Sequence, residues 1–181
     1  MRPFPDKKYQ VIYADPPWNY RHCASKSRRI ENKYPTMSLS EIKALQVPTE
    51  DNAVLYLWAT APKLLEATEV LVAWGFDYRT CAIWDKKIIG MGYWFRGQHE
   101  LLLVGVRGKF SPPAQALRIS SVYQEQRTRH SKKPDAIRNY VAQWYPDHSK
   151  IELFARQRTP GWDVWGNEVP PQRPRQKPCQ T

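Results

Sequence analysis

Apolar runs of strand length recur along the chain, separated by stretches with helical spacing. Residues 53–59 (AVLYLWA) form a continuous apolar run, which is typical of a strand buried on both faces. Four more segments rich in apolar residues predict strands, at residues 11–14, 78–86, 99–108 and 150–156. We expect the run at 150–156 (KIELFAR) to be the last strand of the sheet.

Three segments between these runs have the spacing and the end signals of helices. The first begins at Ser38, a cap-like residue, and the second begins at Pro62 and stops at Gly75. The third covers residues 133–146, with a proline near its start and another at its end. The glycine-bearing, aromatic segment 86–98 predicts a loop or a short hairpin.

Strands that alternate with helices indicate βαβ units, and therefore an α/β fold with a largely parallel sheet. Ligands of such folds bind beyond the carboxyl ends of the strands. The residues that follow Ala14, the residues that follow Trp84 and the segment 154–156 are therefore expected at one ligand site.

The composition fits one packed domain of 181 residues, of which 41% are hydrophobic. We expect this domain to cover residues 1–169, with an irregular course from Gln157 and a proline-rich, basic tail at 170–181. No apolar stretch reaches the roughly 18 residues of a membrane span, and the N-terminus lacks the apolar core of a signal peptide, which favours the cytoplasm. The three cysteines follow no metal-ligand spacing, so no metal is expected.

The chain carries 28 Lys and Arg against 17 Asp and Glu, a formal net charge of +11. Such a surplus favours a polyanionic partner, most often nucleic acid. The basic residues cluster at 21–33 and at 127–133, and Arg28 and Arg29 are our candidates for contacts to phosphate. The alternative is that both clusters are solvated loops.

The segment YADPPWNY, residues 13–20, follows the first predicted strand. Two prolines fix their φ angles and remove two N–H donors, so the chain continues neither as a sheet nor as a helix. We therefore expect a rigid ledge at a strand end, made of Asp15, Pro16, Pro17 and Trp18. It would present a carboxylate, backbone carbonyls and an indole.

Three interpretations of this ledge compete. In the first, Asp15 caps a turn and Trp18 fills the core. A metal site, the second, needs more ligand side chains than the region offers. In the third, the ledge binds the amine of an aromatic base, whose nitrogen lone pair is delocalised into the ring. If Asp15 and the Pro16 carbonyl accept hydrogen bonds from both amine protons, the nitrogen becomes more nucleophilic, while Trp18 stacks on the base.

The motif DPPW after an apolar strand resembles that of amino-methyltransferases that act on adenine N6 with S-adenosylmethionine. Further segments follow in the order of the family of the eukaryotic mRNA adenosine methyltransferase and its bacterial and phage relatives. The resemblance spans residues 11–167 and rests on KYPTMSLSEIKAL, LYLWATAPKLLEATEVLVAWGF, IWDK, GYWFRGQHELLLVGVRG, HSKKPDAIRNYV and KIELFAR. It implies a Rossmann-like methyltransferase fold in which the catalytic motif precedes the cofactor-binding half.

The resemblance also implies roles for individual residues. The catalytic residues would be Asp15, Pro16, Pro17 and Trp18. Residues that match substrate-binding positions are Tyr34, on a loop over the base, and Trp84 and Lys86, on a second loop. Residues that match cofactor-binding positions are Lys133 near the methionine carboxylate, Arg156 and Asn167 near the ribose and adenine, and also Asp15, Phe154 and Glu168. The residues alone leave open a core position for Trp84 and a surface charge for Lys86.

The chain departs from the family pattern in three places. The glycine loop of other methyltransferases is replaced by LFAR after the predicted strand at 150–156, as throughout this family. Lys132 stands where many relatives have histidine, and Glu168 where many have glutamine. The change at Glu168 puts its contact to the adenosine part of the cofactor in doubt.

The family includes enzymes for DNA and for RNA, and the ledge does not distinguish them. DNA is favoured because the compact chain resembles small bacterial or phage enzymes, which act in the cytoplasm, and has a basic segment beside the ledge. The alternatives are an RNA adenosine methyltransferase, a cytosine-N4 methyltransferase and a catalytically silent nucleic-acid-binding subunit. A homodimer is left open.

Overall fold

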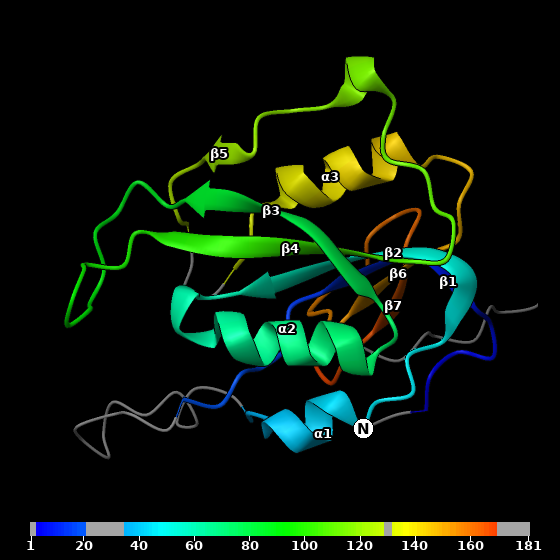
Figure 1. Cartoon of the computed structure of the whole chain (residues 1–181), viewed down its shortest axis with the longest axis horizontal. Coiled ribbons are helices and arrows are strands. Elements are labelled where there is room, and N and C mark those ends of the chain that lie inside the picture. The colour runs from blue at the N-terminus through cyan, green and yellow to red at the C-terminus, as the bar shows by residue number, and fades with distance from the viewer. Residues whose placement is uncertain (1–2, 21–34, 129–131, 170–181) are drawn as a thin grey trace, which may run out of the picture.

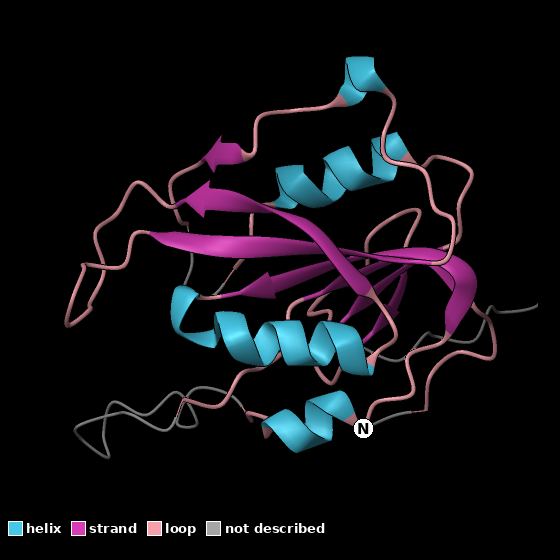
Figure 2. Ribbon diagram, in the orientation of Figure 1, coloured by secondary structure: helices cyan, strands magenta, loops and turns pink. Residues whose placement is uncertain are grey.

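A computed structural model describes residues 3–20, 35–128 and 132–169, which form one mixed sheet with helices on both faces (Figures 1 and 2). The strands are β1 (Tyr9–Ala14), β2 (Thr49–Ala59), β3 (Asp77–Asp85), β4 (His99–Arg107), β5 (Val122–Gln124), β6 (Lys150–Leu153) and β7 (Asp163–Trp165). The helices are α1 (Leu39–Lys43), α2 (Leu64–Ala73) and α3 (Asp135–Trp144), with short 3-10 helices at Ala61–Lys63 and Gln115–Leu117. None of these helices is long and apolar enough to cross a membrane.

The strands lie side by side in the order β5-β3-β4-β2-β1-β6-β7. All neighbouring pairs are parallel except the two that contain β4. Strand β4 therefore runs against the other described strands. As a result, the carboxyl ends of six strands and the amino end of β4 meet along one side of the sheet, which we call the carboxyl edge.

The helices cover the two faces of the sheet separately (Figure 1). Ile42 of α1 and Leu71 of α2 belong to one apolar cluster, together with alternate residues of β1 and β2. Ile137 and Val141 of α3 belong to a second cluster on the opposite face. Because both of its faces are covered, β2 is buried from residue 53 to residue 59, as its unbroken apolar run predicts.

The ends of the helices follow their sequence signals. Ser38 caps α1, since its hydroxyl accepts from the Glu41 N–H and the Glu41 carboxylate accepts in return from the Ser38 N–H. Pro62 opens a 3-10 turn before α2. Gly75 ends that helix with a φ of 83°, a conformation that costs a glycine little.

The α/β prediction is confirmed, and two details of it are corrected. The run at 150–156 is not the last strand, because β7 forms inside the segment that we expected to be irregular from Gln157. Trp162 and Trp165 are buried there, and the packing of these indoles holds the short strand against β6. The sequence also predicts no strand at β5, whose three residues are largely exposed and show no apolar run. The tail at 170–181 lies outside the described residues.

Candidate active site

The ledge leaves β1 at the carboxyl edge, and hydrogen bonds hold its backbone. The Trp18 N–H donates to the Pro16 carbonyl over 2.8 Å, and the Met37 N–H donates to the Pro17 carbonyl over 2.9 Å. A carbonyl oxygen has two lone pairs, so the Pro16 carbonyl keeps one acceptor position for a ligand. The ledge is therefore a fixed backbone feature that still has hydrogen-bonding capacity.

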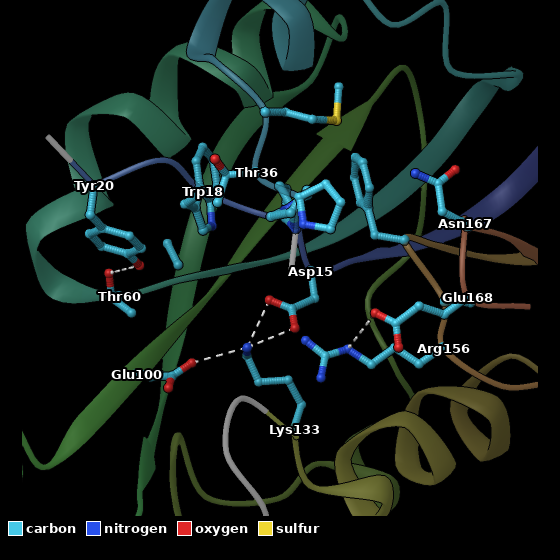
Figure 3. A pocket seen from close by; sticks show the side chains of 18 of the residues that line it. Asp15, Trp18, Tyr20, Thr36, Thr60, Glu100, Lys133, Arg156, Asn167 and Glu168 are labelled. Atoms are coloured by element: carbon cyan, nitrogen blue, oxygen red, sulfur yellow. Dashed lines mark hydrogen bonds and ion pairs between the residues drawn. The ribbon is translucent and has the colours of Figure 1, made fainter. Parts of the chain in front are cut away.

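The indole of Trp18 lies largely within the core. The residue is only 4% exposed, and its Nε1–H donates to the Trp58 carbonyl over 3.1 Å. The part of Trp18 that remains accessible borders the same pocket as Asp15 (Figure 3). Trp18 thus packs in the core, as the first interpretation holds, and its accessible part also borders the cavity, as the third interpretation requires.

Lys133 is the centre of an ionic cluster at the pocket, because its ammonium contacts both Asp15 and Glu100 (Figure 3). The Lys133 ammonium donates to both oxygens of the Asp15 carboxylate, over 2.7 and 2.8 Å, and forms an ion pair with Glu100 over 3.2 Å. The side chains of Lys133 and Glu100 are only 13% and 12% exposed. The Asp15 side chain is 26% exposed, so its carboxylate lies between this cluster and the pocket.

Burial and neighbouring charges shift the pKa values of Asp15 and Lys133 in opposite directions. Burial raises the pKa of the Asp15 carboxyl above its ordinary value, while Lys133 opposes that shift. Burial alone would lower the pKa of the Lys133 ammonium, but the carboxylates of Asp15 and Glu100 outweigh it and raise that pKa. Lys133 consequently stays charged, and Asp15 is a stronger base than an aspartate in water.

Trp84 and Lys86 reach the pocket from the end of β3. Trp84 is 2% exposed, and its Nε1–H donates to the Glu125 carbonyl over 2.8 Å. The Lys86 ammonium lies 3.5 Å from Glu100 Oε1, whereas Lys133 contacts Oε2, and the Lys86 side chain is 16% exposed. Trp84 is therefore a core residue that also lines the pocket, and Lys86 is no solvated surface charge.

The predicted cofactor residues border the pocket from β6 and β7. Arg156 follows β6 and forms a loose ion pair with Glu168, with 3.8 Å between the Arg156 Nε and the Glu168 carboxylate. Phe154 has a φ of 59°, so the chain turns sharply at the end of β6. Gly166 packs so closely on Ala155 that an added Cβ would collide with the Ala155 carbonyl. This close approach aligns Asn167 and Glu168 beside Arg156.

The pocket has a volume of about 410 Å³. It brings together eleven of the residues that the sequence predicts, namely Asp15, Pro16, Pro17, Trp18, Trp84, Lys86, Lys133, Phe154, Arg156, Asn167 and Glu168. A second cavity of about 670 Å³ lies beside it and shares Asp15, Lys133, Phe154, Arg156 and Glu168. Lys132 lines this second cavity and pairs with Asp135. Three predicted substrate residues, Arg28, Arg29 and Tyr34, lie outside the described residues.

The pocket is also lined by Glu100, Tyr20 and Thr60, which the sequence patterns do not predict as site residues. Glu100 stands at the head of the apolar run ELLLV, and a lone carboxylate beside such a run is a signal for a buried polar role. Its place at the carboxyl edge follows from the reversed direction of β4. Tyr20 and Thr60 share a hydrogen bond of 2.8 Å between their hydroxyls, which ties the ledge to the end of β2.

The described part of the chain contains no group of three or more His, Cys, Asp or Glu side chains arranged to hold a metal ion. The ionic cluster instead combines anions and cations, which suits a ligand that has both charges. Asp15 can act as the base in this pocket, and Lys133 and Arg156 can donate to the carboxylate or the hydroxyl groups of a zwitterionic ligand.

Comparison with known proteins identifies relatives along nearly the whole chain. Residues 9–168 match the MT-A70 family. The chain is 38% identical to the Type II methyltransferase M.MunI of a Mycoplasma species, over 92% of this chain and 80% of that protein. It is 28% identical to the human N(6)-adenine-specific methyltransferase METTL4, over 90% of this chain and 38% of that protein.

A fungal relative is named for its action on RNA. The chain is 28% identical to the N6-methyladenosine RNA methyltransferase MTA1 of Cryphonectria parasitica, over 89% of this chain. It spans 52% of the length of that protein. The chain thus covers most of its bacterial relative but only about half, or less, of the fungal and human ones.

Proposed function

The chain belongs to the MT-A70 family, and from that premise we propose that it transfers a methyl group from S-adenosylmethionine to the N6 amine of adenine in DNA. The observation that carries the proposal is the Asp15 carboxylate beside the Pro16 carbonyl, on a proline-stiffened ledge inside a pocket. These two acceptors match the two protons of a planar amine. Adenine N6 methylation is the activity of the family to which the chain belongs.

The ledge would act on the amine in two ways. Hydrogen bonds from both N6 protons to Asp15 and Pro16 would localise the nitrogen lone pair and direct it toward the methyl donor. The same carboxylate would then take the proton that the amine loses, since burial raises the pKa of Asp15 and makes it a better base. The accessible part of Trp18 would guide the plane of the base.

The residues around Asp15 fit the charges of the cofactor. When bound, S-adenosylmethionine supplies a methyl group on a positively charged sulfur. Lys133 can bind its carboxylate, Asp15 can face its positive centres, and Arg156 can bind its ribose and adenine part. Asn167 and Glu168 offer hydrogen-bonding groups for hydroxyls and an amino group, and Phe154 offers an aromatic surface. Both signs of charge and the polar groups are thus present in adjoining cavities.

Cofactor binding must rearrange the ionic cluster. The three N–H donors of Lys133 are directed to two oxygens of Asp15 and one of Glu100. A carboxylate of the cofactor would replace one of these contacts and leave Asp15 more accessible to the amine. Lys133 therefore couples occupation of the cofactor site to the state of the catalytic carboxylate.

DNA is the proposed substrate, in the cytoplasm of a bacterial or phage-infected cell. The chain is more similar to the Type II methyltransferase, at 38% identity, than to the fungal RNA methyltransferase, at 28%. Trp84 and Lys86 would flank the base, and Arg28, Arg29 and Tyr34 complete the proposed substrate site. An adenine in a duplex must leave the base stack to reach such a pocket, which costs a few kcal/mol. Contacts from basic residues to phosphate would offset that cost.

The direct test is incubation with labelled S-adenosylmethionine and matched DNA and RNA, followed by mass spectrometry of the nucleosides. We expect N6-methyldeoxyadenosine from DNA and none in a reaction with Asp15→Asn. Methyladenosine from RNA alone would favour the RNA alternative, and N4-methylcytosine would overturn the adenine assignment. A chain that binds no cofactor in calorimetry would be a silent subunit.

A further inference from the structure

Three consecutive aromatic side chains project into solvent from the loop between β3 and β4. Tyr93 is 93% exposed, Trp94 95% and Phe95 90%, and we call these three residues the aromatic tip. Ile89 and Met91 beside them are 66% and 78% exposed. Exposed apolar patches of this kind mark sites of interaction, because leaving them in water is costly.

The stem of this loop holds the aromatic tip away from the rest of the protein. Gly90 and Gly97 pair through a backbone hydrogen bond of 2.9 Å, and the Arg96 guanidinium donates to the Gly90 carbonyl over the same distance. Gly92 is required at the turn, since an added Cβ would collide with the Phe95 carbonyl. The aromatic tip is thus presented on an organised hairpin, and the residues that organise it are all within the loop.

Both ends of the loop are anchored in the wall of the pocket. Lys86 follows β3 and Glu100 is the second residue of β4, and both line the pocket that contains Asp15. The loop therefore extends beyond the carboxyl edge of the sheet, at the end of the molecule where the strand-end residues gather (Figure 1). A polymer whose base enters the pocket would pass this loop.

The charge of the loop favours a polyanion. Residues 85–98 contain three cations and one carboxylate, a net charge of +2. Lys86 pairs with Glu100 in the pocket, so Arg96 is the exposed cation beside the aromatic tip. Asp85 is already neutralised by Lys87 and accepts a hydrogen bond from Gln98. Aromatic faces beside positive charge suit a chain of bases joined by phosphates, whereas a second copy of this chain would also have a net charge of +11.

We propose that the aromatic tip stacks on nucleobases that neighbour the target adenine, and so stabilises the nucleic acid in an unstacked form. This inference rests on the proposed nucleic-acid substrate and adds a second contact outside the pocket. When the target adenine leaves the double helix, the adjacent bases lose a stacking partner, and an aromatic side chain can take its place. The tip would act in binding and would take no part in the transfer of the methyl group.

The test separates bases from phosphates. Two fluorescently labelled single-stranded DNA probes of equal length are compared, one with mixed bases and one with abasic sugars throughout. The proteins are the parent, the variant Tyr93→Ser/Trp94→Ser/Phe95→Ser, and a control, Leu65→Ser/Val72→Ser, which removes exposed apolar side chains from α2. The loop variant should bind the mixed-base probe about tenfold more weakly or worse, the loss typical of a removed base-stacking contact.

The abasic probe should bind the parent and both variants equally, and Trp94→Phe should keep most of the affinity for bases. Equal loss on both probes, no loss on either, or a parent that binds neither probe would overturn the inference. A parent that is a dimer and a loop variant that is a monomer, with unchanged DNA affinity, would identify the tip as a contact between two copies instead. Methyl transfer is assayed separately, so tip-dependent binding by an inactive parent would refute the proposed function and leave the tip contact standing.

Discussion

Helix α3 has a buried lysine beyond each of its ends, and the two lysines are bound in different ways. Lys133 precedes the helix and contacts the carboxylates of Asp15 and Glu100. Lys150 follows the helix, at the start of β6, and its ammonium donates to the carbonyls of Tyr145, Pro146 and His148 over 2.7, 3.0 and 2.8 Å. The same side chain thus meets charged partners at one end and neutral ones at the other.

At the carboxyl end of α3, all three hydrogen-bond donors of Lys150 are satisfied by backbone carbonyls. We call this region the Lys150 end, and the region before α3 the Lys133 end. Carbonyl groups near the carboxyl end of a helix lack partners in the helix and carry partial negative charge, so a cation there is favourable. Burial lowers the pKa of Lys150, and its three donors are matched by three carbonyls of the chain itself. Such an arrangement stabilises the turn after α3 and leaves no donor for a ligand.

At the Lys133 end, carboxylates compensate the charge of the ammonium. The partial positive charge at the start of a helix disfavours a lysine, so carboxylates from β1 and β4 must hold this one. Carboxylate oxygens accept more than one hydrogen bond, and these line an open pocket. Lys133 therefore has charged partners that a ligand in the pocket can reach, whereas the carbonyl partners of Lys150 serve the fold alone.

The largest effect is expected from removing the carboxylate that distinguishes the Lys133 end. Asp15→Asn keeps the shape of the side chain but replaces a charged acceptor with an amide that also donates. Single-turnover methylation at saturating cofactor should fall by at least about a hundredfold, as when other preorganised polar contacts to a transition state are lost. The variant should still fold and bind S-adenosylmethionine, with losses of stability and affinity far smaller than the loss of turnover, because the amide oxygen still accepts from Lys133. A variant that methylates adenine at the parent rate would reduce the ledge to a stiff turn.

The next largest effect concerns the lysine itself. Lys133→Met should weaken binding of S-adenosylmethionine by roughly 1.5–3 kcal/mol, the worth of a hydrogen bond to a charged group. Lys43→Met is the control, because Lys43 pairs with Glu69 at the surface and lines neither cavity. Isothermal calorimetry measures both. Equal affinities in the two variants would mean that Lys133 serves only to hold Asp15.

The opposite end of α3 should respond in stability alone. Lys150→Met leaves three carbonyls without their donor and should lower the free energy of unfolding by roughly 1.5–3 kcal/mol. Urea denaturation measures the loss, and calorimetry should find cofactor affinity unchanged in the folded variant. If Lys150→Met weakened cofactor binding as much as Lys133→Met, the distinction between the two ends would be wrong.

The sequence predicts the Lys133 end better than the Lys150 end. Apolar runs and helix-end signals locate β1, β2 and α3, and the proline pair places Asp15 at a strand end. The hydrogen bonds of Lys150 are made to backbone carbonyls of the turn after α3, and no sequence motif predicts the conformation of that turn. Such contacts arise only when α3 packs against the sheet, so periodicity contains no information on them.

Glu100 and β7 illustrate two further limits. Glu100 stands out in its apolar run, but it reaches the pocket because β4 is antiparallel, and the sequence left segment 86–98 as a loop or a hairpin. Strand β7 has three residues, too few for an alternating pattern, and of these only Trp165 is buried, where it packs in the core beside β6. In both cases tertiary pairing decides what the local sequence leaves open.

The smallest expected effect is a displacement of the acid limb of the pH profile of activity. Asp15 accepts hydrogen bonds from the amine only when it is unprotonated, and burial raises its pKa above the ordinary value of 3.8. Activity should therefore fall, as the pH is lowered, at a higher pH than for an aspartate in water. Lys133→Met removes the cation that lowers this pKa, so its acid limb should move further toward neutral pH. The profile of kcat/KM for DNA, measured at saturating cofactor, should show no such displacement for Lys150→Met. A limb that stays in place in Lys133→Met would mean that Lys133 does not control the protonation of Asp15.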